Sequence, residues 1–96
     1  MKKYEVMFIV KATIESDLVK KTAEEMKKII TDQAGKVLEF KELGEKKLAY
    51  PIQKELNGYY FVMQIEASKE AESEFARKAK LDENVLRHLI VKLDEE

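Results

Sequence analysis

Two runs of alternating residues near the middle of the chain constrain its fold more than any other feature. Apolar residues recur at every second position in residues 48–52 and again in residues 59–65, which is the period of a pleated β-strand. Asn57-Gly58 stands between the two runs and is typical of a tight hairpin turn. The pattern therefore predicts one β-hairpin over residues 43–65.

Pro51 lies inside the first of these runs. Because proline has no N–H group, it cannot donate to a sheet ladder and is found on edge strands. We therefore expect the first strand of the hairpin at an edge of the sheet, with its lysines near solvent.

Two other segments have the period of a helix. In residues 16–34, apolar side chains recur three and four positions apart, with Ser16 as the N-cap candidate and Gly35 as the C-terminal stop. A shorter stripe predicts a second helix from an N-cap at Ser68 to about Lys80. Further strands are predicted over residues 4–11, 36–40 and 85–93, the second being long and kinked near Gly44.

The elements follow the order strand, helix, strand, strand, helix, strand. This order most often folds as two split β-α-β units, so we predict a ferredoxin-like α+β sandwich. It has a four-stranded antiparallel sheet with two helices on one face, and its strand order is last, first, third, second. The residues predicted to face the helices are Tyr4, Val6, Phe8, Val10, Tyr59, Phe61, Met63 and Ile65, and those left for the open face are Met7, Ile9, Tyr60 and Val62.

The length and composition exclude several classes of protein. Ninety-six residues suffice for a single domain, which we place at residues 1–96. The chain has no cysteine, and its longest apolar run is far too short to span a bilayer, so we expect a soluble cytoplasmic protein. Eighteen basic and nineteen acidic residues leave a net charge of −1; any contact with a polyanion must come from a local patch.

The sequence contains no recognisable set of catalytic or metal-binding residues. His88 is the only histidine, and the three glycines are isolated, so a histidine-based metal site and a phosphate-binding glycine loop are not predicted. We therefore expect no catalytic activity, no metal site and no cofactor.

Cations and flat side chains gather around the hairpin, as RNA recognition requires: Lys41, Lys46, Lys47 and Lys54, with Tyr50 and Tyr60 nearby. Lys2, Lys3, Arg87 and Lys92 would extend this patch if neighbouring strands bring them close. The competing explanation is a lysine-rich edge that only blocks association between strands. Stacking of bases on Tyr59 or Phe61 is not expected, because both are predicted to face the helices.

A longer motif is more specific than the order of elements. Residues 43–54 read LGEKKLAYPIQK, Gly58-Tyr59-Tyr60 follows, and Lys3-Tyr4-Glu5 opens the chain. Together these segments resemble the bacterial small-subunit ribosomal protein six family, in the same order and over nearly the whole chain. Arginine is common at the basic pair in that family, so Lys46 and Lys47 keep the charge but lose the planar fork of the guanidinium.

The resemblance implies a structural constituent of the small ribosomal subunit. It implies binding to the central domain of the small-subunit (16S) rRNA as a heterodimer with small-subunit ribosomal protein eighteen. The net charge fits this expectation, because a protein with few phosphate contacts binds RNA weakly without a basic partner. The predicted RNA contacts are Lys2, Lys3, Lys46, Lys47, Lys54 and Arg87, and the predicted partner-facing residues are Tyr50, Tyr60 and Val62.

Two other classes of protein stay open at this point. A regulatory or interaction domain of the same fold would bind a small molecule or another protein in place of rRNA. An acylphosphatase-like enzyme would need a glycine-rich anion cradle and an arginine after the first strand, and residues 11–15 provide neither.

Overall fold

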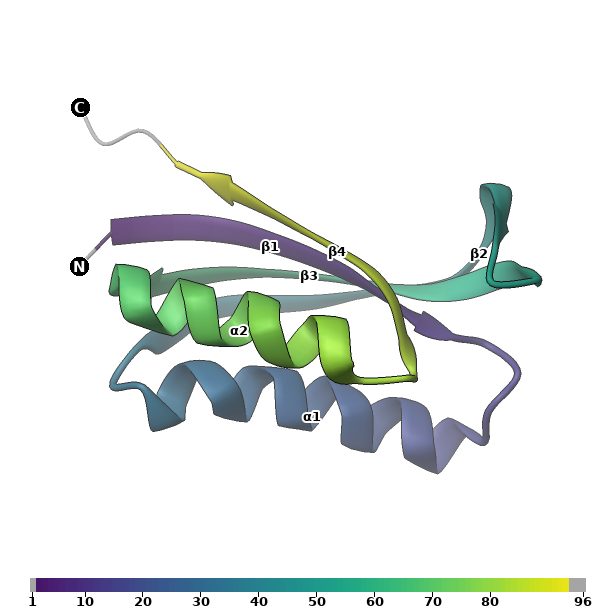
Figure 1. Cartoon of the computed structure of the whole chain (residues 1–96), viewed down its shortest axis with the longest axis horizontal. Helices are drawn as coiled ribbons and strands as arrows, with labels where there is room; N and C mark the ends of the chain where they lie inside the picture. The colour runs from purple at the N-terminus through teal and green to yellow at the C-terminus, as the bar shows by residue number, and fades with distance from the viewer. Residues whose placement is uncertain (1, 94–96) are drawn as a thin grey trace.

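The computed structural model describes residues 2–93. Its elements are β1 (Lys2–Lys11), α1 (Ser16–Asp32), β2 (Lys36–Ile52), β3 (Glu55–Ala67), α2 (Lys69–Leu81) and β4 (Val85–Lys92). Both helices cover one side of the sheet, and the far end of β2 turns away on the other side (Figure 1).

The strands form one antiparallel sheet in the order β2-β3-β1-β4. This confirms the predicted ferredoxin-like fold, including the edge position of the strand that contains Pro51. The kink predicted near Gly44 is also present, because the register between β2 and β3 shifts between Glu42 and Gly44. β2 nevertheless continues as a single strand of 17 residues.

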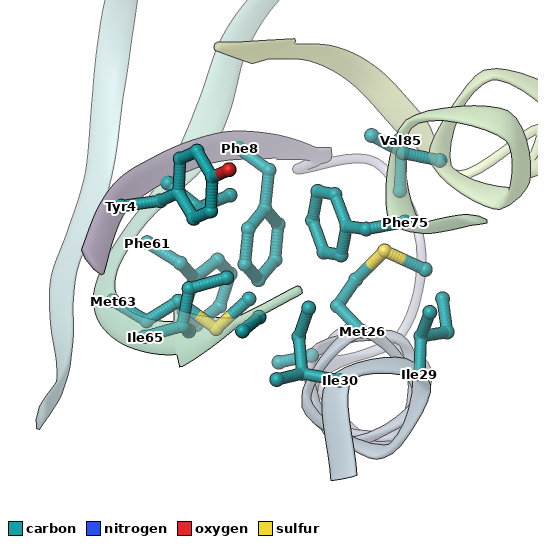
Figure 2. Close-up of a cluster of buried hydrophobic side chains, with 14 of the residues drawn as sticks. Tyr4, Phe8, Met26, Ile29, Ile30, Phe61, Met63, Ile65, Phe75 and Val85 are labelled. Atoms are coloured by element: carbon teal, nitrogen blue, oxygen red, sulfur yellow. The ribbon is translucent and has the colours of Figure 1, made fainter. Parts of the chain in front are cut away.

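The main hydrophobic core lies between the sheet and the helices (Figure 2). Phe8 and Phe61 stack at the centre of the sheet, with ring centroids 5.2 Å apart, and Phe75 of α2 packs against Phe8 at 6.3 Å. Met26 and Ile30 of α1 complete the contact. The eight residues predicted to face the helices all belong to this cluster, Tyr59 as a partly buried neighbour.

The helix ends confirm one predicted cap and correct two others. Ser68 caps α2, its Oγ accepting a hydrogen bond from the Ala71 N–H at 3.2 Å. The N-cap of α1 is Glu15 rather than Ser16, and no side chain caps that end. Beyond α1, the residue in the left-handed conformation is Ala34, with φ of 64°. The helix therefore ends at Asp32, two residues before the predicted end at Ala34, and Gly35 follows with its amide donating to the Ile30 carbonyl at 2.9 Å.

The hairpin turn also differs from the prediction. Ile52 pairs with Glu55, and the two residues between them, Gln53 and Lys54, have φ values of 50° and 68°. Two consecutive positive φ values are the signature of the type I′ turn that joins strands with a two-residue loop. Asn57-Gly58 lies inside β3 instead. Its glycine is required by packing, as described below.

Candidate functional site

The end of the hairpin forms an arm, defined as residues 48–54, that folds over the open face of the sheet. Leu48 and Ile52 of this hairpin arm pack in a small hydrophobic cluster with Ile9 of β1 and Leu86 of β4. Ile9 was predicted on the open face, and it lies there, yet it is only 4% exposed because the arm covers it. The arm is therefore fixed by a core of its own.

Gly58 makes room for this second cluster. A Cβ atom on Gly58 would lie 2.4 Å from the Ile9 Cγ2 atom and 3.5 Å from the Leu48 Cδ2 atom. No real Cβ atom approaches another carbon as closely as the first of these distances, so a side chain at position 58 would displace Ile9. The glycine thus permits the arm to close on the sheet.

A cleft of about 210 Å³ lies between the hairpin arm and the sheet. Its lining is mainly apolar, with Met7, Tyr60 and Leu89 on the sheet side. At its rim, Arg87 Nη1 of β4 donates a hydrogen bond to the Tyr50 Oη atom of the arm. This bond joins the two edge strands across the open face and brings together one predicted RNA contact and one predicted partner contact.

The lysines predicted to bind RNA near the hairpin are exposed at the arm and its base. Lys46, Lys47 and Lys54 form no ion pair with any residue from 2 to 93. Lys41 differs, because its ammonium lies 3.5 Å from a Glu39 carboxylate oxygen. Successive strand residues point to opposite faces, so Lys46 and Lys47 present their charges on the two sides of β2.

The predicted contacts at the start of the chain are far from the hairpin arm. Lys46 lies opposite Gly58 near the start of β3, whereas Lys3 lies opposite Glu66 near its end. That span is about 27 Å at roughly 3.4 Å per residue. Lys2 and Lys3 therefore do not extend the patch of Lys46, Lys47 and Lys54, although Arg87 does reach the arm.

The middle of the open face carries an apolar surface that continues the cleft. Val62 lies opposite Met7, and Met7 lies opposite Leu89 across the sheet. Leu89 and Val91 of β4 are 49% and 47% exposed, while Tyr60 and Val62 are half-buried. Neither Leu89 nor Val91 was predicted as part of a binding surface. Their alternation with Ile90 could have placed them on the open face, since Ile90 packs against the main core on the other face.

Carboxylates border this apolar surface on the side away from the hairpin arm. Glu5 pairs with Gln64, which pairs with Glu39, and Glu66 lies one row further along. Lysines lie in the same rows, because Lys3 and Lys36 lie opposite Glu66 and the Lys41 ammonium lies 3.5 Å from a Glu39 carboxylate oxygen. A partner that covers the open face would therefore meet apolar side chains next to charges of both signs.

Among residues 2–93, no three His, Cys, Asp or Glu side chains are grouped so that they could hold a metal ion. His88 faces the helices, its ring 6.2 Å from that of Phe75. Desolvation lowers the pKa of His88, and the nearby Lys80 charge lowers it further. Both effects favour a neutral structural imidazole at this position.

None of the helices in the described part of the chain is long and apolar enough to cross a bilayer.

The fold and the site together define a class of protein. A ferredoxin-like sandwich with an open, apolar sheet face and a lysine-bearing hairpin arm has the features of a module that binds macromolecules. A similar solved structure is the crystal structure of 30S ribosomal protein S6 from Thermotoga maritima. It is 25% identical in sequence, with a TM-score of 0.90, and the match covers 96% of this chain and 87% of that chain.

The family model described as Ribosomal protein S6 matches residues 3–92. The chain therefore belongs to the ribosomal protein S6 family and is a small-subunit ribosomal protein. This family is structural and non-enzymatic, and its members associate with the ribosome. The resemblance drawn from residues 43–54 is thus confirmed.

Proposed function

We propose that this small-subunit ribosomal protein binds the central domain of the 16S rRNA as a heterodimer with small-subunit ribosomal protein eighteen, in the cytoplasm. The hairpin arm and its base contact the RNA, and the open face of the sheet contacts the partner protein. The observation that carries the proposal is the arm itself, which is anchored by Leu48 and Ile52. Lys54 of the arm and Lys46 and Lys47 at its base form no ion pair with any of residues 2–93.

The anchoring of the arm favours RNA binding for an energetic reason. A flexible lysine segment would lose conformational freedom on binding, and this loss would offset part of the electrostatic gain. Here Leu48 is 6% exposed, and Arg87 and Tyr50 are joined by a hydrogen bond. The backbone that carries Lys46, Lys47 and Lys54 is therefore ordered before the RNA arrives.

The small number of cations near the arm also supports the binding of a partner protein. Three lysines and one arginine can neutralise only a few phosphates, so the affinity of the isolated chain for RNA should be low and sensitive to salt. A basic partner on the apolar open face would add cations next to those of the arm. The partner side of the proposal rests on Tyr50, Tyr60 and Val62, together with Met7, Leu89 and Val91.

The test is replacement of Lys46, Lys47 and Lys54 by alanine in the heterodimer. Binding to a central-domain RNA fragment should weaken, and the slope of log affinity against log salt should fall by about one for each phosphate that the protein no longer neutralises. The matched control replaces Lys20, Lys21 and Lys28 of α1, which are exposed and make no ion pair within residues 2–93. Equal slopes for the two triple variants would refute the role of the arm.

A further inference from the structure

A second cavity lies at the end of the sheet opposite the hairpin arm. β1 begins there, β4 ends there, and α2 begins there (Figure 1). The cavity has a volume of about 600 Å³, and the side chains that border it with polar groups are Tyr4, Ser68, Lys69, Glu72, Lys92 and Lys2. It shares no lining residue with the cleft beneath the hairpin arm.

The Tyr4 side chain supplies a hydrogen-bond donor that no group of residues 2–93 accepts. Tyr4 is only 4% exposed, and its ring packs in the main core (Figure 2). Within residues 2–93, no group forms a hydrogen bond with its hydroxyl. Every side-chain nitrogen or oxygen of these residues that is shut off from solvent does have a hydrogen-bond partner. The Tyr4 hydroxyl is therefore not enclosed, and it opens into the cavity that Tyr4 lines.

The charges around the cavity favour an anion. Lys92 lies directly opposite Tyr4 in the β1–β4 register, and Lys69 is the first residue of α2. Neither lysine forms an ion pair with another residue in the range 2–93. Among residues 2–93, the cavity is lined by these two ammonium groups, by Lys2 and by one carboxylate, that of Glu72.

The start of α2 adds partial positive charge to the same cavity. The first amides of a helix have no acceptor within it, and the helix dipole places partial positive charge at this end. Ser68 Oγ satisfies the Ala71 amide, while the amides of Lys69 and Glu70 remain available in the first turn. A hydroxyl donor, two ammonium groups and a helix N-terminus together match the acceptors and charge of a phosphate.

We propose that this cavity binds one phosphate group. The Tyr4 hydroxyl donates a hydrogen bond to it, and Lys69 and Lys92 supply the neutralising charge. The further statement that this is a backbone phosphate of rRNA rests on the proposed function. The RNA would then contact the protein at both ends of the sheet, at the hairpin arm and at the Tyr4 cavity.

The cavity is tested first without RNA. The full-length chain labelled with ¹⁵N is titrated with inorganic phosphate against chloride at fixed pH and ionic strength. Saturable amide shifts are expected at Tyr4, Lys69 and Glu70. Tyr4→Phe keeps the ring but removes the donor, and it should weaken binding roughly threefold to tenfold. The double variant Lys69→Gln, Lys92→Gln should abolish saturation, whereas the charge-matched control Lys20→Gln, Lys21→Gln should behave as the unmodified chain. Shifts that do not saturate, or that persist in the Lys69 and Lys92 double variant, overturn the site.

The ligand assignment is tested separately with RNA. In the heterodimer, Lys69→Gln with Lys92→Gln should lower the salt slope for the central-domain RNA by about one relative to the charge-matched control. An identical slope and affinity, in a protein whose cavity binds inorganic phosphate, overturns the assignment to an RNA phosphate. If the unmodified heterodimer does not bind the RNA at all, the proposed function fails, and the phosphate titration still decides whether the cavity is a site.

Discussion

Substitution of Gly58 by alanine should destabilise the protein through one specific contact. The added Cβ would meet the Ile9 Cγ2 atom at 2.4 Å, and this atom is bonded directly to the branched Cβ of Ile9. A β-branched side chain has few alternative rotamers, so Ile9 cannot turn aside cheaply. Because Ile9 is 4% exposed beneath the hairpin arm, the strain must be absorbed by the arm or by β1.

The expected cost follows from the kind of strain. Overpacking of a well-packed core costs about 1–3 kcal/mol, and alanine recovers several tenths of a kcal/mol because it is less flexible than glycine in the unfolded chain. We therefore expect Gly58→Ala to lower the free energy of unfolding by about 1–2 kcal/mol. Folding should stay cooperative, since the main core on the other face of the sheet is untouched.

A double-mutant cycle with Ile9→Ala isolates the contact. Ile9→Ala alone should cost about 2–4 kcal/mol, because it removes a buried side chain. It also removes the Cγ2 atom, so adding Gly58→Ala to it should cost nothing or fill part of the cavity. The double variant is then more stable than the sum of the single effects predicts, by about 1–3 kcal/mol.

Gly44 provides the control for this cycle. Its φ is 87°, and a Cβ there would meet no atom within 4 Å. Gly44→Ala should therefore cost about 1 kcal/mol or more through backbone strain, and Ile9→Ala should not relieve it. The assay is urea unfolding followed by circular dichroism. If Gly58→Ala and Ile9→Ala are additive, as Gly44→Ala and Ile9→Ala should be, the packing explanation of Gly58 is wrong.

Two further predictions concern the open face and the histidine. Leu89→Asp should weaken association with small-subunit ribosomal protein eighteen by at least about tenfold in calorimetry, whereas Leu18→Asp on α1, at a similarly exposed position, should not; equal effects would refute the interface. Because the pKa of His88 is lowered in the folded protein, the unfolded chain binds more protons than the folded chain near and below about pH 6.5. The free energy of unfolding should therefore decrease as the pH is lowered through this range. His88→Gln should remove this part of the pH dependence between about pH 7.5 and 5.5, and an unchanged urea-midpoint profile would contradict it.

The periodicity of the chain was enough to predict the fold. Alternation in β1 and β3 identified the residues that face the helices, because burial on one side of a sheet requires apolar residues at every second position. Pro51 placed β2 at the edge for a reason that involves only its own missing N–H. These features depend on local chemistry, and for that reason the sequence alone reveals them.

The position of the turn could not be predicted in the same way. Asn57-Gly58 has the local signature of a hairpin turn, whereas Gln53 and Lys54 have unfavourable residue types for two positive φ values. The tertiary contact of Gly58 with Ile9 outweighs that preference. A residue type chosen for close packing is indistinguishable in sequence from one chosen for backbone conformation.

The site shows the same division between local and tertiary information. The sequence by itself determined the order of elements, the strand residues of the main core, the edge position of the hairpin and the family motif of residues 43–54. Only the tertiary structure decided that Arg87 meets Tyr50, that Lys2 and Lys3 lie far from Lys46, and that Tyr4, Lys69 and Lys92 line one cavity. Each of these depends on strand register and on the path of the arm, which are set by interactions between residues distant in the chain.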